Sequence, residues 1–138
     1  MSNEVWLQHY LAAWNTRDGK RVAEWMADDA TYEDVALGQR HTGRQAITAF
    51  VDGMTGFSTD YRFESVSEFS TDTNYVAEWE LSGTHDGDGA GLPATGKSYR
   101  IRGVSVGTLH QGKIISNRDY WNMADFLVQI GALPPPPG

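Results

Sequence analysis

Asp119 is the residue with the clearest capacity for chemistry, because it is a carboxylate within an alternating run, 113–122, that predicts a β-strand. A second such run, 98–109, precedes it, and the three-residue turn between them ends in Gly112, which closes hairpin loops of this length well. Strand alternation gives the face of Asp119 an amide, an indole and several small side chains: Ile101, Gly103, Ser105, Gly107, Ile115, Asn117 and Trp121. Small residues leave space beside a carboxylate, so this face predicts a ligand pocket in which Asp119 acts as an acid or a base.

The expected three-residue turn also fixes a register for the hairpin. The facing pairs are Leu109–Lys113, Ser105–Asn117, Gly103–Asp119 and Ile101–Trp121. A second interpretation is equally strong on these residues alone: Asp119 is solvated, and Gly103 and Gly107 mark β-bulges.

Two further side chains are candidates for the same chemistry. Asp34 ends a short predicted strand, 30–34, and shares a face with Tyr32, which suits the rim of a pocket. Tyr10 lies in the middle of a predicted helix, where its phenol could donate a hydrogen bond. Each also has an ordinary interpretation, as a solvated carboxylate for Asp34 and as a core aromatic residue for Tyr10.

If Asp119, Asp34 and Tyr10 face one apolar cavity, the site holds two carboxylates and a phenol. Burial and mutual repulsion raise carboxyl pKa values, so one Asp can act as a base while the other stays protonated. Tyr10 would donate to a developing enolate oxygen. This set suits proton abstraction beside a carbonyl, in an isomerisation, an aldol cyclisation or a dehydration, with no metal or organic cofactor. The side chains expected to contact the substrate are Asn117, Trp121, Ser105, Tyr32, Trp14 and Trp79.

The composition is that of one folded domain. The chain has 138 residues, and we expect a single domain over residues 1–133 followed by an extended Pro-rich tail, 134–138. A net charge of −7 argues against nucleic acid and against anionic membranes as partners. The absence of cysteine excludes disulfides, a thiol nucleophile and thiolate metal sites. Without a secretory pattern or an apolar run of membrane-spanning length, the chain is expected to be cytoplasmic.

Periodicity and turn residues predict the elements that must position the candidate residues. Helices are expected over 3–15, from Asp18 to Met26, from the capping-box pattern Thr42-Gly43-Arg44-Gln45 to about Met54, and over 123–130. Strands are expected over 30–34, 61–69, 74–84, 98–109 and 113–122, with loops over 35–41 and 85–97. The order predicts an α+β fold in which three N-terminal helices pack on one face of a curved, mainly antiparallel sheet.

The sequence contains no strong pattern of metal-binding residues. Four histidines lack the spacing of metal ligands: His9, His41, His85 and His110. His85 with Asp86 and Asp88 is similar to a calcium loop, but the segment lacks the further acidic ligands that such a loop needs. No metal is therefore expected.

Several short segments carry a resemblance to a known family through their order and spacing: His41-Thr42-Gly43, Ser82-Gly83-Thr84-His85, Gly91 to Lys97, Gly112-Lys113-Ile114, Arg118 to Trp121 and Gln129-Ile130-Gly131. The chain resembles the SnoaL-like polyketide cyclases, or ester cyclases, of the nuclear-transport-factor-2-like superfamily. The resemblance implies a cone-shaped α+β fold with a deep pocket between helices and sheet. It also implies that Asp119 is the acid–base residue of an intramolecular aldol ring closure. At three neighbouring positions the chain departs from the family, with Asn117 and Ser105 in place of His and Gly103 in place of Gln.

The run 27–34 is similar to the corresponding run of the ketosteroid isomerases, another branch of the same superfamily. This resemblance implies that Asp34 is a general base and that Tyr10 donates to the enolate oxygen. The second donor of those isomerases, a protonated acid, is absent, because Val104 or Ser105 stands at its position.

Two other functions stay open for such a fold. Epoxide hydrolases on this fold activate water with an Asp-Arg-Asp set, but Arg100, Arg102 and Arg118 fall on the hairpin face opposite Asp119. There they form either an anion site or a solvated or dimer-facing surface. A non-catalytic protein that binds a small molecule is the other alternative. The resemblance further implies a hydrophobic small-molecule ligand and a homodimer formed through the outer face of the sheet.

Overall fold

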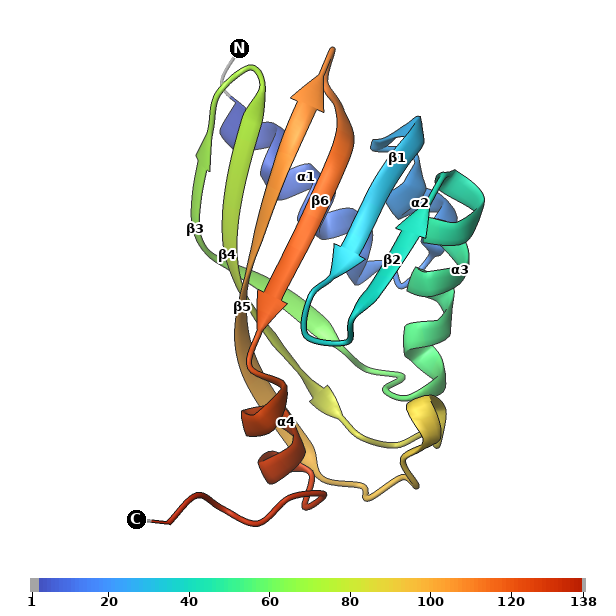
Figure 1. The fold of residues 1–138 in the computed structure, drawn as a ribbon, viewed down its shortest axis with the longest axis vertical. Helices are drawn as coiled ribbons and strands as arrows, with labels where there is room; N and C mark the ends of the chain where they lie inside the picture. The colour runs from blue at the N-terminus through green and yellow to red at the C-terminus, as the bar shows by residue number, and fades with distance from the viewer. Residues whose placement is uncertain (1–2, 138) are drawn as a thin grey trace.

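Six strands form one curved sheet, in the order β2-β1-β6-β5-β4-β3, in the computed structural model, which describes residues 3–137. Neighbouring strands are antiparallel except β1 and β6, which run parallel (Figure 1). The elements follow one another as α1 (Asn3–Asn15), α2 (Gly19–Ala23), β1 (Met26–Asp34), β2 (Gln39–Thr42), α3 (Arg44–Gly53), η1 (Met54–Gly56), β3 (Arg62–Ser70), β4 (Asn74–Thr84), η2 (Gly89–Gly91), β5 (Ser98–His110), β6 (Lys113–Trp121) and α4 (Met123–Gln129). This architecture confirms the predicted α+β fold with helices on a curved, mainly antiparallel sheet.

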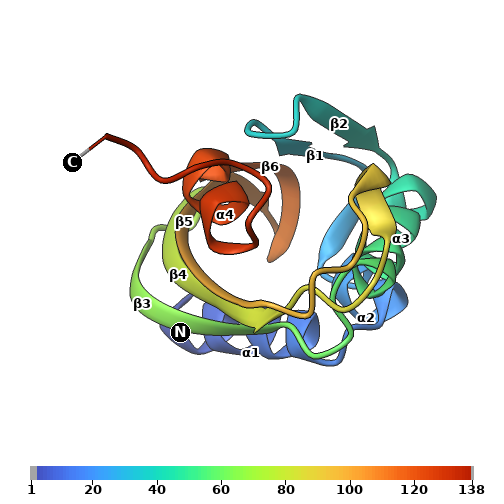
Figure 2. The same ribbon diagram turned by 90° about the horizontal axis from the view of Figure 1, so that it is seen from below.

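The helices and the sheet enclose the interior together. Figure 2 shows the sheet curling round one side, while α1, α2 and α3 close the other side and α4 lies across the lower end. Buried apolar side chains come from helices and strands alike: Leu7, Trp14, Val22, Met26, Ile47, Val51, Tyr61, Tyr75, Ile101, Ile114 and Ile130. The core fills the space between the two layers, and the inner face of the sheet projects into it.

α1 is an amphipathic helix that is fixed at its end to β3. Its buried residues follow the helical period: Leu7, Tyr10, Ala13 and Trp14. The Asn15 side chain donates to the carbonyl of Phe63 at 2.9 Å and accepts from the Phe63 N–H at 2.7 Å. The helix is confirmed over the predicted range, 3–15. Ser2, one candidate for its cap, lies outside the described residues.

The segment around β1 and β2 differs from the prediction. β1 begins at Met26 rather than at residue 30, and β2 occupies Gln39–Thr42, most of which was expected to be loop. β2 is a four-residue edge strand whose side chains are mostly exposed, so it lacks the apolar alternation by which strands are recognised. Asp34, the last residue of β1, pairs with Gln39, and this short hairpin therefore frames one of the candidate carboxylates.

Of the two predicted helix caps, the one at the start of α2 is confirmed and the one at the start of α3 is wrong. Asp18 caps α2, because its carboxylate accepts from the Lys20 N–H at 3.0 Å, although the helix ends at Ala23 instead of Met26. The predicted capping box before α3 is wrong. Gly43 is the N-cap, at φ 89° and without a side-chain hydrogen bond, because Thr42 is held in β2 by its pairing with β1.

The β5–β6 hairpin has a different register from the one expected. Its turn contains two residues, Gln111 and Gly112, both at positive φ (51° and 77°), as in the tightest hairpin turns. The pairs are His110–Lys113, Gly107–Asn117, Ser105–Asp119 and Gly103–Trp121, with a register shift near Thr108. This shift turns Ile115 to the outer face, where it is exposed, so its predicted place beside Asp119 is wrong.

Candidate active site

Asp119 lies at the centre of a buried hydrogen-bond network on the inner face of the sheet. Its Oδ1 accepts from the Ser105 hydroxyl at 2.6 Å and from the Asn117 amide at 2.9 Å. Its Oδ2 accepts from the Tyr32 hydroxyl. Only 7% of the residue is exposed. Three side chains predicted to lie in the site, from β1, β5 and β6, thus hold one carboxylate in a fixed orientation.

A second layer of donors orients the first. The Trp79 indole N–H donates to the Ser105 hydroxyl oxygen at 2.9 Å, and the Tyr75 hydroxyl donates to the Asn117 side-chain carbonyl. The Ser105 hydroxyl and the Asn117 amide are therefore left to donate to Asp119. Tyr75 was not predicted as a site residue. Its signal was available in the sequence, since it lies on the same strand face as Trp79, four residues earlier.

The environment of Asp119 makes its carboxyl a group that titrates near neutrality. Burial raises the pKa of Asp119 to about 6, the hydrogen bonds from Ser105, Tyr32 and Asn117 oppose that rise, and the nearby charge of Asp34 adds to it. Burial and the Asp119 charge raise the pKa of the Tyr32 hydroxyl well above its usual value, so Tyr32 remains a proton donor. A base with a pKa close to ambient pH is well suited to proton transfer.

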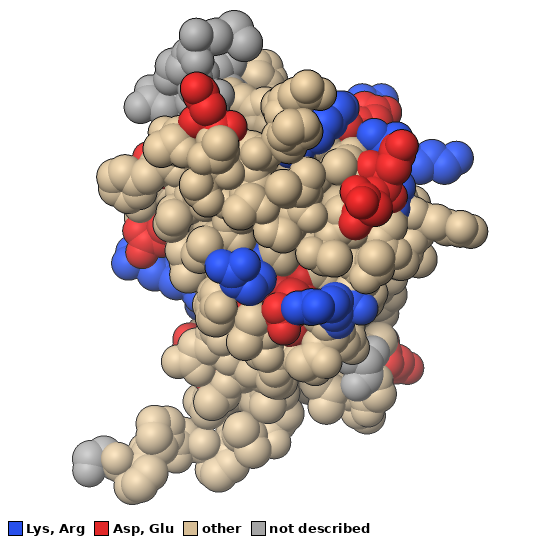
Figure 3. Space-filling view, turned by 45° about the horizontal axis from the view of Figure 1, so that its top comes forward, with Lys and Arg blue, Asp and Glu red and all other residues tan. Residues whose placement is uncertain are grey.

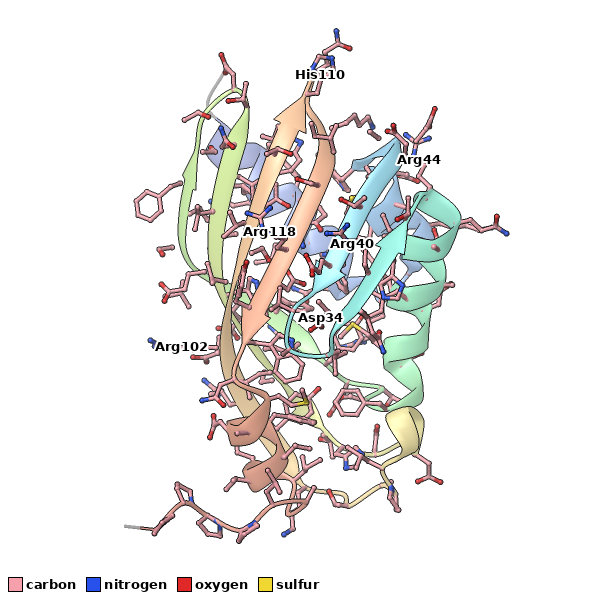
Figure 4. The ribbon with its side chains drawn as sticks, in the orientation of Figure 1. Asp34, Arg40, Arg44, Arg102, His110 and Arg118 are labelled. Atoms are coloured by element: carbon pink, nitrogen blue, oxygen red, sulfur yellow. The ribbon has the colours of Figure 1, made fainter. Side chains whose placement is uncertain are left out.

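Asp34 lies beside Asp119 but has different partners. The Trp121 indole N–H donates to its two carboxylate oxygens at 2.9 and 3.1 Å, and the Leu37 backbone N–H donates at 3.0 Å. Burial raises the pKa of Asp34, and these hydrogen bonds oppose the rise. In Figure 4 it lies at the end of β1, next to the turn into β2. Asp34 is thus buried on the same sheet face as Asp119, and its hydrogen-bond donors are different from those of Asp119.

A small cavity adjoins Asp119. It is lined by Leu7, Tyr10, Leu11, Trp14, Tyr32, Phe63, Ser65, Glu68, Ala77, Glu78, Trp79, Ser105 and Asp119. Its volume is about 20 Å3, room for about one water molecule. Ser65 is exposed and Leu11 is half-buried, so the cavity opens between β3 and α1. Five of these thirteen residues are aromatic and three are aliphatic, which suits an apolar ligand that also carries polar groups.

The cavity brings together six of the nine predicted site residues: Asp119, Tyr10, Ser105, Tyr32, Trp14 and Trp79. The other three, Asp34, Asn117 and Trp121, lie near it without lining it. Tyr10 is buried on α1, and its ring stacks on Trp6 at 5.6 Å between centroids. Burial raises the pKa of the Tyr10 hydroxyl, which keeps it protonated over the physiological range.

Gly103 and Gly107 neither leave open space nor mark bulges. A Cβ atom on Gly103 would lie 2.2 Å from the ring of Trp79, and one on Gly107 would lie 2.2 Å from the ring of Tyr75. Each glycine is the pairing partner of that aromatic residue across β4 and β5. The space expected beside Asp119 is therefore occupied by two rings of the adjacent strand, which explains the small volume of the cavity.

The arginines of the hairpin lie away from Asp119. Arg100 and Arg102 are exposed on the outer face, at 2.7 and 3.6 Å from the carboxylate of Glu80. Figure 4 shows Arg102 and Arg118 on the side of the sheet opposite α1. The Asp-Arg-Asp set of an epoxide hydrolase is therefore not assembled around Asp119 among the described residues.

Metal binding has no support in the described part of the chain. Among the side chains that the structure describes, no three from His, Asp or Glu converge as metal ligands would. The segment that is similar to a calcium loop is held internally: Asp86 accepts from Thr59 and Asp88 accepts from the Ala94 N–H. In the same part of the chain, no helix is both long and apolar enough to cross a membrane.

Comparisons with known proteins agree with this architecture. The sequence profile of the SnoaL-like domain matches residues 7–117. The structure is similar to a candidate polyketide cyclase from Pseudomonas putida KT2440, with 25% identity, a TM-score of 0.77, and coverage of 89% of this chain and 93% of that one. A candidate SnoaL-like polyketide cyclase from Jannaschia sp. CCS1 has 22% identity and a TM-score of 0.82, with 96% and 92% covered. A protein of ketosteroid isomerase-like fold from Catenulispora acidiphila DSM 44928, in complex with trimethylamine, has 19% identity and a TM-score of 0.82, with 92% of each chain covered.

Proposed function

Since the chain belongs to the SnoaL-like domain family, we propose that it is a cofactor-free acid–base enzyme that acts on a small hydrophobic cyclic or polyketide-like carbonyl compound. The observation that carries the proposal is the buried Asp119 carboxylate, which faces an aromatic cavity, accepts three side-chain hydrogen bonds and has a pKa of about 6. The candidate polyketide cyclases of the same fold add support for carbonyl chemistry.

In the proposed mechanism, Asp119 removes a proton from the carbon beside the substrate carbonyl. The C–H bond breaks, the proton passes to a carboxylate oxygen, and the electron pair moves onto the carbonyl oxygen as an enolate. Tyr10 would donate a hydrogen bond to that oxygen, because it lines the cavity and its raised pKa keeps its proton in place. The enolate can take the proton back from Asp119 at another carbon, which is an isomerisation. Alternatively it attacks a second carbonyl of the same molecule: a C–C bond forms, the C=O π bond breaks, and the resulting alkoxide takes the proton from Asp119, which completes an aldol cyclisation.

Asp34 has a supporting place in this proposal. Its carboxylate is held by Trp121 and Leu37 and does not line the cavity, whereas its charge acts on Asp119. We therefore rank Asp119 as the principal base and Asp34 as a group that tunes it. Asn117, Ser105 and Tyr32 position the base, and Trp14 and Trp79 would contact the substrate.

A non-catalytic small-molecule-binding protein is the second candidate, because both oxygens of Asp119 already accept hydrogen bonds from Ser105, Asn117 and Tyr32, as in a carboxylate with a structural role. Either candidate requires the cavity to widen. A volume of about 20 Å3 admits about one water, so a carbonyl compound enters only if side chains at the mouth move apart. The two candidates differ in whether a bound ketone loses its α-proton.

Deuterium exchange separates these candidates without knowledge of the natural substrate. The probe is 1-tetralone, a bicyclic ketone, incubated with the protein in D2O and followed by NMR at its α-carbon. We expect exchange above the buffer rate with the wild type and a loss of about 100-fold or more with Asp119→Asn, a typical value for removing a general base. Equal rates for the two proteins, or a wild type no faster than acetate buffer, would leave the binding role as the better explanation.

The proposal includes a homodimer formed through the outer face of the sheet. Four apolar side chains on this face are exposed: Phe69, Val76, Ile115 and Tyr120. Figure 3 shows charged groups of both signs scattered over the visible surface, with wide areas that carry none. Apolar area of this kind is typical of a protein–protein interface.

A further inference from the structure

One row of paired residues crosses four strands from Asp119 to a second acid, Glu68. Asp119 pairs with Ser105, Ser105 with Ala77, and Ala77 with Glu68. All four residues line the same cavity. Neighbouring strands are about 4.8 Å apart, so Asp119 and Glu68 stand at opposite ends of a row about 14 Å long, measured along the sheet between their backbones.

Glu68 faces the cavity because of an irregularity in β3. The register with β4 shifts between Ser65 and Ser67, which places an extra residue, Val66, in the strand. Without it, Ser65 and Glu68 would point to opposite faces, since they are three residues apart. With it, both line the cavity, and the Ser65 hydroxyl donates to Oε1 of Glu68 at 2.7 Å. Bulges re-aim single side chains in this way beside functional sites.

The other carboxylate oxygen of Glu68 lacks a partner. Oε2 is buried, and no donor within the described residues reaches it. An unpaired buried acceptor is costly, and a hydrogen bond to a charged oxygen is among the stronger ones in proteins. At the far end of the row, by contrast, both oxygens of Asp119 already accept hydrogen bonds. Glu78, which also lines the cavity, accepts from the Ser67 hydroxyl at 3.0 Å. Among the carboxylates that line the cavity, Glu68 is therefore the one with a buried oxygen that would gain from a donor on a ligand.

We infer that Glu68 is a specificity residue that binds a hydroxyl group of the ligand, at the end remote from its reactive carbonyl. The substrate class is then a hydroxylated cyclic carbonyl compound, with its carbonyl near Asp119 and Tyr10 and its ring over Ala77. A neutral hydroxyl fits better than an ammonium group, because Ala77, Phe63 and Trp79 line the cavity beside this row and a charge is costly to move from water to apolar surroundings. This inference rests on the proposed function for the role of Asp119, but the binding step is separate from the proton transfer.

The test compares three ketones of one skeleton: 6-hydroxy-1-tetralone, 6-methoxy-1-tetralone and 1-tetralone. Binding is followed by NMR of the 15N-labelled protein, with the indole N–H of Trp79, which lines the cavity, as the reporter. We expect the wild type to bind the hydroxy compound about tenfold more tightly than either of the others. Glu68→Gln should weaken this preference, because an uncharged amide oxygen is a weaker acceptor than a carboxylate oxygen. Glu64→Gln is the matched control, since Glu64 is an exposed acid on the same strand and its substitution changes the charge equally.

Three results would overturn the inference: equal affinity of the wild type for all three ketones, an undiminished preference in Glu68→Gln, or no binding of any of them. The α-proton exchange, read in D2O with the same compounds, keeps the two proposals apart. If the protein exchanges the α-proton of 1-tetralone but binds the three ketones equally, the role of Asp119 as a base is supported and the role of Glu68 is rejected. A hydroxyl preference that depends on Glu68, without exchange, supports Glu68 and rejects the enzyme.

Discussion

Asp34 and Asp119 are direct partners across β1 and β6, the parallel strand pair of the sheet, so their two buried carboxylates lie side by side on its inner face. Parallel pairing is what brings the end of β1, early in the chain, to the end of β6, late in the chain. The negative charge of Asp34 contributes to the raised pKa of Asp119, which is otherwise caused by burial. The protonation of Asp119 thus depends on Asp34, an acid far from it in the sequence.

The first prediction concerns the pH dependence of exchange. A base must be unprotonated, so the rate of α-proton exchange should rise with pH and reach half its maximum near the Asp119 pKa of about 6. Asp34→Asn removes the neighbouring charge and should shift this midpoint to lower pH while most of the activity remains. The measurement is the pH–rate profile of 1-tetralone exchange. Asp29→Asn, an exposed acid of the same strand, is the control, and an unshifted midpoint in Asp34→Asn would contradict the coupling.

The second prediction concerns stability. The folded-state pKa of Asp119 lies above its usual value of 3.8, so the folded protein binds this proton more tightly than the unfolded chain does. Ionisation of Asp119 therefore lowers the free energy of unfolding as pH rises from about 4 to about 6. One pKa unit is about 1.4 kcal/mol, and the cost above pH 6 is thus about 3 kcal/mol at most.

Asp119→Asn should recover part of this energy. The amide retains one acceptor for Ser105 and Asn117, and its N–H2 can donate to the Tyr32 hydroxyl oxygen. We expect the variant to have a higher Tm than the wild type at pH 8 and no such advantage at pH 4, in scanning calorimetry. A variant that is less stable at both pH values would show that the carboxylate itself holds the fold together.

The sequence predicted the elements of this fold better than their pairing. Alternation and turn residues place β4, β5 and β6 within about one residue of their observed bounds, because those strands carry regular apolar patterns. The register of the last hairpin was wrong because a two-residue turn and a three-residue turn both suit the same Gly112. A bulge then reversed the direction of Ile115, and no local pattern marks such a shift.

Most residues of the candidate site could be predicted from the sequence, but the size of the cavity beside them could not. Asp119, Tyr32, Ser105 and Asn117 are found together because each lies on an inward face of its strand. The filling of the cavity depends on rings from the adjacent strand, which alternation within one strand does not reveal. Glu68 was missed for a related reason, since only the bulge in β3 turns it inward.

The third prediction tests the homodimer. Phe69→Asp places a charge at the most exposed large apolar side chain of the outer sheet face, which should weaken an interface formed there. We expect light scattering after size exclusion to give the mass of two chains for the wild type and of one chain for the variant. Leu133→Asp is the control, because Leu133 is an exposed apolar residue outside the sheet. A wild type of one-chain mass, or a dimer unaffected by Phe69→Asp, would reject this interface.

The fourth prediction tests the packing that closes the cavity. In Gly103→Ala, the added Cβ would overlap the Trp79 ring, so the ring must move and its hydrogen bond to Ser105 is disturbed. Overpacking of a core costs about 1–3 kcal/mol, and we expect urea unfolding to report a loss of this size. Gly53→Ala is the matched control. Gly53 has φ −66° near the end of α3 and nothing within 4 Å of an added Cβ, so this variant should be as stable as the wild type or slightly more so. If Gly103→Ala were as stable as Gly53→Ala, Trp79 would be free to leave its position over Gly103. The ring would then be a movable wall of the cavity and not a fixed part of the core.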